Sequence, residues 1–264
     1  MKLLTVPALR GVSWMLGGFQ VFARQPLATT ALFMAFLFGL MLLISLPGIG
    51  PLLALVLVPA ANVGFVLASE AVQAGRMPSP ALLVAALRGA RPRTVVMLQL
   101  GLAYAMAALL AMWLIDLIDP DFDASLAEFV KQAQGNKDGQ LPDTGVQSGL
   151  LLRLLLPLPV TLLFWHAPVV VYRSHVGVAQ ALFASGVACW RNRGAFALYG
   201  LAWGLLPALL GLVVMAFFSL IGESQLAVLP LVPLLLMCSA AFYASLYFTV
   251  ADCFEFDAPT EPQA

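Results

Sequence analysis

Six long apolar segments dominate the sequence and limit what it can fold into. Each contains about 20 or more mostly apolar residues, the length that a helix needs to cross the hydrocarbon core of a bilayer. The segments are residues 27–46, 52–71, 94–118, 150–172, 195–221 and 227–250. Inside lipid the backbone must satisfy its own hydrogen bonds, so we predict an all-α integral membrane protein with six transmembrane helices in one bundle.

The overall composition agrees with this prediction. Hydrophobic residues make up 62% of the 264 residues and charged residues 10%, whereas soluble domains have about 45–50% and about 25%. A soluble fold with this excess would expose large apolar patches to water. The formal net charge is zero, so the distribution of charge is more informative than its total.

Three shorter segments precede the pairs of spans and are too polar to cross a membrane. Residues 8–24 place polar side chains at alternating steps of three and four, as expected for a helix lying in the membrane interface. Residues 79–91 begin with a serine and a proline, a typical helix start, and residues 174–190 are more weakly amphipathic. We therefore predict three hairpins, each preceded by an interfacial helix, in pseudo-repeat units 1–76, 77–173 and 174–264, with an extracytoplasmic loop at 119–149.

The basic residues predict which side of the membrane the termini occupy. One predicted face holds ten of them: Lys2, Arg10, Arg24, Arg76, Arg88, Arg91, Arg93, Arg173, Arg191 and Arg193. The other holds three: Lys131, Lys137 and Arg153. Because cytoplasmic loops are enriched in Lys and Arg, both termini and the interfacial helices are predicted to be cytoplasmic.

Three polar residues inside the spans form a candidate intramembrane site: His166, Asn62 and Gln99. An ionisable residue within a span is by default a functional candidate, and His166 is the only one well inside. A neutral histidine can equally bond a neighbouring helix or a carbonyl freed by Pro168. The first interpretation predicts a small transporter or channel, and the second a structural role.

A second candidate site is the cluster of arginines beside the interfacial segments: Arg88, Arg91, Arg93, Arg191 and Arg193. Arginines in these positions can bind anionic lipid headgroups or a partner protein. The preference for positive charge on the cytoplasmic side would also place them there without any ligand. The leading hypothesis is a non-enzymatic membrane module. Its expected partners are lipids, with a partner membrane protein or a second copy also considered and no role for nucleic acid.

No catalytic or cofactor motif is present, so we expect no enzyme activity and no cofactor. Asp119, Asp121 and Asp123 have the spacing of the first ligands of a calcium loop, but Ala124 and Val130 stand where that loop needs glycine and glutamate. Three cysteines at 189, 238 and 253 are far apart in sequence and predict neither a metal site nor a disulfide framework.

Three stretches carry a resemblance to a known family: "ALFASGVACWRNRGAFALYGLAW" (181–203), "VPALRGVSWMLGGFQVFARQPLATTALF" (6–33) and "LPGIGPLLALVLVPAANVGF" (46–65). They resemble a family of bacterial inner-membrane proteins with six spans and no assigned activity. A looser similarity, in architecture, links the chain to the membrane domain of some bacterial glycerophosphodiester phosphodiesterases. The resemblance implies inner-membrane location and topology, and provides no catalytic residues.

Overall fold

The computed structural model describes residues 1–135 and 146–256, and within them six helical stretches are long and apolar enough to cross a membrane. They are α2 (Pro26–Ile44), α3 (Gly50–Gln73), α4 (Arg91–Ile118), the interrupted run Val146–Ser174, α10 (Arg193–Leu220) and α11 (Val228–Cys253). The only strands in the described ranges are two residues long, β1 (Lys2–Leu3) and β2 (Phe254–Glu255). The predicted all-α, six-span membrane fold is confirmed.

The segments predicted to precede each hairpin are present, but one of them has a different geometry. The first and third are α-helices, α1 (Arg10–Arg24) and α9 (Val178–Arg191). The second is a helix of the 3-10 type, η1 (Pro80–Leu87), and not an α-helix. Its eight residues begin after the Ser79 cap, whose side chain accepts the Ala81 N–H.

Prolines interrupt the fourth span at two places. It consists of α6 (Val146–Leu155), α7 (Leu158–Trp165) and α8 (Ala167–Ser174), with Pro157 before α7 and Pro168 at the start of α8. Proline lacks the N–H that a helix interior needs. Pro59, Pro207 and Pro233, in contrast, lie inside continuous helices.

The polar loop contains one further helix, α5 (Phe122–Gly135). At this distal end Arg153 pairs with Asp119 at 2.7 Å and lies 3.6 Å above the Phe122 ring. Residues 136–145, including Lys137 of the orientation argument, lie outside the described ranges. A 3-10 turn, η2 (Ser224–Ala227), joins α10 to α11.

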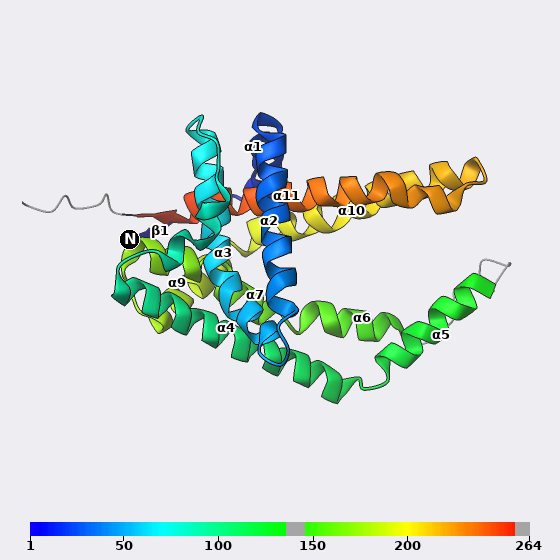
Figure 1. Cartoon of the computed structure of the whole chain (residues 1–264), viewed down its shortest axis with the longest axis horizontal. Coiled ribbons are helices and arrows are strands. Elements are labelled where there is room, and N and C mark those ends of the chain that lie inside the picture. The colour runs from blue at the N-terminus through cyan, green and yellow to red at the C-terminus, as the bar shows by residue number, and fades with distance from the viewer. Residues whose placement is uncertain (136–145, 257–264) are drawn as a thin grey trace, which may run out of the picture.

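Polar contacts bring the starts and ends of the three hairpins together at one end of the molecule, called here the basic end. Arg24 donates to Gln73, Arg173 pairs with Glu70 and Arg191 donates to Thr5. From this end the hairpins diverge: α10 and α11 extend to the right in Figure 1, α4 and α6 to the lower right, and α2 and α3 run vertically. The helices are therefore bundled mainly at the basic end, and α10 leaves its apolar face uncovered.

The core at the basic end is built around α1. Trp14 is 1% exposed and lies against the rings of Phe196 and Tyr199 from α10. Gly11 is essential to this packing, because a Cβ there would overlap the carbonyl oxygen of Ala195. The helix predicted to lie in the interface thus also packs its inner face against α10 and α11.

Candidate functional site

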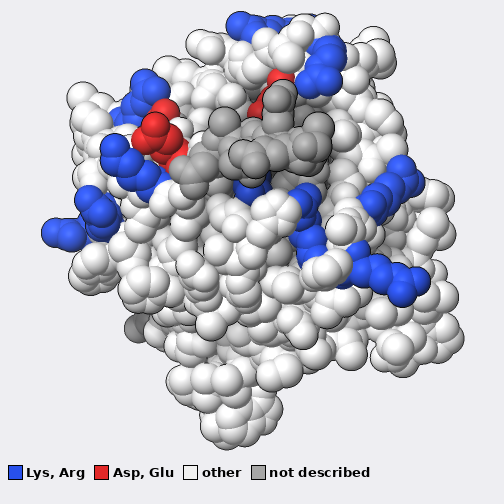
Figure 2. All heavy atoms as spheres, turned by 90° about the vertical axis from the view of Figure 1, so that its left-hand side faces the viewer, with Lys and Arg blue, Asp and Glu red and all other residues white. Residues whose placement is uncertain are grey.

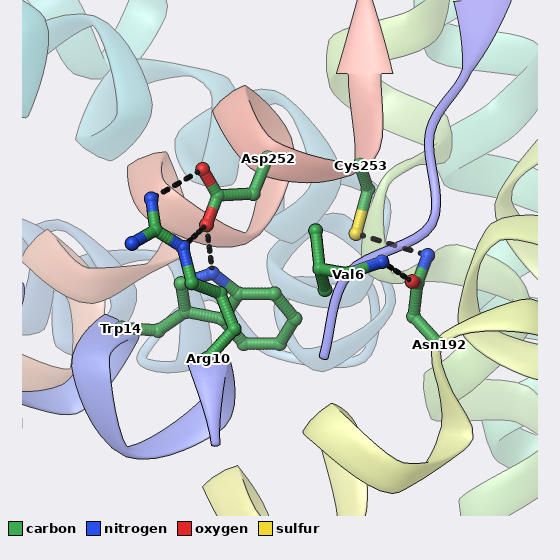
Figure 3. A network of polar contacts seen from close by, with 6 residues as sticks. All are labelled: Val6, Arg10, Trp14, Asn192, Asp252 and Cys253. Atoms are coloured by element: carbon green, nitrogen blue, oxygen red, sulfur yellow. Dashed lines mark hydrogen bonds and ion pairs between the residues drawn. The ribbon is translucent and has the colours of Figure 1, made fainter. Parts of the chain in front are cut away.

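Asn192 lies at the corner between α9 and α10 and joins three separate segments (Figure 3). The residue is 2% exposed. Its amide oxygen accepts the Val6 N–H at 2.8 Å, and its amide nitrogen donates to the carbonyls of Leu4 and Ala188, each at 3.0 Å. The same nitrogen lies 3.5 Å from the Cys253 sulfur. Asn192 thus fixes the N-terminal segment against α9 and the end of α11.

A second contact joins α1 to the last turn of α11 (Figure 3). Arg10 donates from Nε and Nη2 to the Asp252 carboxylate at 2.7 and 3.1 Å, and Trp14 Nε1 donates to it at 2.7 Å. Two-pronged pairing is the stronger form of an arginine–carboxylate contact. The hydrogen bonds and charge of Asp252 raise the pKa of the Arg10 guanidinium. With the antiparallel pairing of β1 and β2, these contacts hold the first and last described segments side by side.

The break at His166 is sealed by a side chain from α9. In an unbroken helix the His166 N–H would donate to the Leu162 carbonyl, four residues earlier. Instead it donates to the Ser185 hydroxyl at 3.0 Å, and Ser185 donates to the Leu162 carbonyl at 3.0 Å. Ser185 is inserted into the hydrogen-bond ladder, which is a known cause of a sharp kink. The third interfacial helix therefore completes the fourth span.

The His166 side chain is completely buried among residues that come from other elements. Nδ1 lies 3.7 Å from the Cys189 sulfur, and the ring lies edge-on to Phe196 and Phe254. Nε2 is buried and has no hydrogen-bond partner within the described part of the chain. Burial, and next the nearby Cys253, raise the pKa of the Cys189 thiol to about 12. This thiol therefore stays protonated near neutral pH and is a poor nucleophile.

The structure does not gather the three predicted intramembrane residues into one cluster. Asn62 is half-buried in the middle of α3, and Gln99 is exposed on α4. No hydrogen bond joins any two of Asn62, Gln99 and His166, all of which are described. The contacts of His166 come from α9, α10 and β2.

The five predicted arginines have no acidic partner among the described residues, unlike three other basic residues at this end. Figure 2 shows the basic end face on, with Lys and Arg side chains around it and few acidic ones. Lys2, Arg10 and Arg173 are paired with Glu255, Asp252 and Glu70. In residues 1–135 and 146–256, no carboxylate lies within ion-pair distance of Arg24 or Arg76, nor of the five arginines predicted as a site: Arg88, Arg91, Arg93, Arg191 and Arg193. This set is called the five arginines below.

Contacts of the five arginines are with neutral groups. Arg191 donates to the Thr5 hydroxyl at 3.1 Å, and the Arg193 guanidinium lies 5.6 Å from the centre of the Trp190 ring. All are exposed except Arg93, which is half-buried. Their charges are thus open to an external anion.

The sequence does not single out Asn192, Ser185 or His175, which also contribute to this end. Asn192 stands between two arginines and so looks like part of a solvated turn. For Ser185 a signal exists, because it shares the buried small-residue stripe of α9 with Ala181, Ala184 and Ala188, and such stripes mark close helix contacts in membranes. The contact of His175 with Arg93 depends on tertiary structure alone.

Six apolar helices with large exposed apolar side chains define a multi-pass α-helical membrane protein. The sequence is 32% identical over 264 residues to a protein of Burkholderia thailandensis named as a probable inner membrane protein. The alignment covers 100% of this chain and 97% of that protein, and the chain belongs to the same family. No protein-family model and no solved structure matches the sequence.

Proposed function

We propose that the protein is a non-enzymatic module of the bacterial inner membrane that binds anionic lipid headgroups at its cytoplasmic face through the five arginines. The observation that carries this proposal is the absence of carboxylate partners for all five among the described residues, next to three basic neighbours that have them. Each basic residue near an anionic membrane surface contributes about 1 kcal/mol to binding. Five of them supply enough attraction to retain anionic lipids.

Large exposed apolar side chains near these arginines support the same interpretation. Phe183 and Trp190 on α9 are 72% and 71% exposed, and Leu9 before α1 is 75% exposed. Aromatic side chains of this kind favour the headgroup level, with basic residues beside them. The name of the relative supports the inner membrane as the location, and the excess of Lys and Arg supports a cytoplasmic position for this face.

Analysis of the lipids that copurify with the full chain tests the proposal. The five arginines are replaced together by glutamine in one variant and by lysine in another, which keeps the charge at the same positions. We expect the wild type and the lysine variant to be enriched in phosphatidylglycerol and cardiolipin, and the glutamine variant to lose this enrichment. An unchanged lipid ratio in a well-folded glutamine variant overturns the proposal.

A polar site for transport is the second candidate, and one observation favours it. His166 is buried at a helix break with Nε2 unpartnered among the described residues, and interrupted helices can mark substrate sites in transporters. Proton and solute flux into liposomes containing the wild type and His166→Phe tests this candidate. Flux that requires His166 would favour transport, and equal background leakage for both would exclude it.

A further inference from the structure

Arg93, at the start of α4, contacts His175, which follows the last residue of α8. Arg93 Nη2 lies 3.0 Å from Nδ1 and 2.7 Å from Nε2 of the ring. Arginine is only a donor, so a neutral ring accepts from Arg93 through its unprotonated nitrogen. The other ring nitrogen keeps an N–H, which cannot bond to the guanidinium and is able to donate to an external acceptor.

The charge of Arg93 has little compensation within the protein. No carboxylate among the described residues lies within ion-pair distance, and its Nε is buried without a partner in the same part of the chain. The guanidinium lies 5.6 Å from the centre of the Tyr172 ring. His175 has φ of 54°, in the left-handed region that is uncommon for residues other than glycine. This left-handed residue ends α8, which is a common way for a helix to stop.

A cavity of about 130 Å³ lies beside this pair. Arg93 and His175 line it together with the apolar side chains of Val96, Val171 and Val176. This volume accommodates a group larger than a single water molecule. The cavity thus combines hydrogen-bond donors with an apolar wall, as the junction of a phosphate group and a hydrocarbon chain requires.

Two helices begin at the edge of the cavity. Pro92 in the first turn of α4 and Gly177, the N-cap of α9, both line it. Neither helix has a side-chain cap. Pro92 has no N–H and the Arg93 N–H donates to the Ala90 carbonyl. The first N–H groups and the partial positive charge of α9, in contrast, reinforce the preference of Arg93 and His175 for an anion.

We propose that the pocket formed by Arg93, His175 and the three valines binds a phosphate group, either in an anionic phospholipid or as a free phosphate. This inference rests on the proposed lipid binding and narrows it to one specific site. Arg93 and His175 donate to the phosphate oxygens. The valine wall accepts the glycerol and first acyl carbons when the ligand is a lipid.

Native mass spectrometry of the delipidated full chain, titrated with phosphatidylglycerol, phosphatidylcholine or inorganic phosphate, tests the site. The variants are Arg93→Gln and His175→Asn, the second chosen because asparagine tolerates the left-handed conformation. Arg76→Gln is the matched control, since Arg76 is exposed, is not one of the five arginines and also lacks a carboxylate partner among the described residues. Thermal melting of each variant verifies its folding.

We expect the first phosphatidylglycerol to bind roughly tenfold or more weakly to Arg93→Gln and to His175→Asn, because each loses a charge-assisted hydrogen bond. The control should change by about twofold at most. If inorganic phosphate binds to the wild type and Arg93→Gln abolishes that binding, the ligand is free phosphate. If inorganic phosphate does not bind to the wild type, the ligand is the lipid.

Equal weakening by all three substitutions overturns the specific site but leaves general lipid binding by the five arginines intact. A second outcome also overturns only the specific site: phosphatidylglycerol binds equally well to both pocket variants and the wild type, while the five-glutamine variant still loses anionic lipid. Unchanged binding in every variant overturns both proposals.

Discussion

Replacing Asn192 by alanine should be far more damaging than replacing the arginines on either side of it. The substitution removes an acceptor from the Val6 N–H and a donor from the Leu4 carbonyl in a largely buried corner. Each backbone group left unpaired costs about 1–3 kcal/mol. The expected loss is therefore about 2–6 kcal/mol, which corresponds to a decrease in melting temperature of about 4–24 °C.

Melting followed by intrinsic fluorescence in one detergent, with size-exclusion profiles before and after heating, measures the effect of Asn192→Ala. Arg191→Gln and Thr5→Ala are the matched controls, because both side chains are exposed and bond mainly to each other; they should shift the midpoint by about 2 °C or less. Limited proteolysis should release the N-terminal segment only in Asn192→Ala. Equal melting midpoints for Asn192→Ala and Arg191→Gln would refute the assignment of Asn192 as the residue that fixes this segment.

Three further substitutions or labelling experiments test the packing at the basic end. Ser185→Ala should lower the free energy of unfolding by about 1–3 kcal/mol, because the His166 N–H loses its acceptor. An unchanged melting midpoint would contradict the role of Ser185 at the helix break. Gly11→Val should sharply reduce the yield of monodisperse protein, because a Cβ at this position overlaps the backbone of α10. Gly200→Val should be tolerated, because nothing lies within 4 Å of a Cβ at Gly200. Equal yields of the two variants would exclude this packing of α1. In a variant with the other two cysteines replaced by alanine, Cys189 should resist maleimide at pH 8 and react only after denaturation in SDS. The reason is that burial raises the pKa of the Cys189 thiol to about 12. Rapid labelling of the native protein would contradict this burial.

Apolar length was sufficient to predict the spans. Lipid forces each long apolar segment to satisfy its own backbone hydrogen bonds, so about 20 such residues have few alternatives to a transmembrane helix. Pro47, Gly48 and Gly50 between the first two spans likewise allow little but a tight reversal. The predicted end of the first interfacial helix at residue 24 and start of the fifth span at residue 195 agree with α1, which ends at Arg24, and α10, which begins at Arg193.

The candidate site was less accessible to prediction, because it depends on contacts between distant segments. Asn192 accepts from Val6, 186 residues earlier, and no local pattern indicates this. Depth along a span also says nothing about which side of a helix a residue occupies, so Gln99 could be placed in the membrane but not recognised as exposed. The 3-10 geometry of η1 has the same origin, since a serine and a proline signal a helix start without fixing its type.

The diverging hairpins have a consequence for lipid contact. Because the distal part of the α10–α11 hairpin extends away from the other spans (Figure 1), the apolar side chains of most of α10 and of the first half of α11 are left open to lipid, whereas the second half of α11 is packed in the core. The basic end is the place where elements from all three hairpins meet, and the five arginines lie around it. Lipids bound there would contact side chains from more than one hairpin.

The central claim is that the five arginines recognise anionic lipid, and lipid-dependent stabilisation tests it most directly. A ligand at about 100 times its Kd stabilises a protein by about 2.7 kcal/mol, or roughly 5–10 °C here. We predict such an increase in melting temperature for the delipidated wild type with phosphatidylglycerol, little with phosphatidylcholine, and little with either lipid for the five-glutamine variant. Equal stabilisation of wild type and variant by phosphatidylglycerol would contradict the claim.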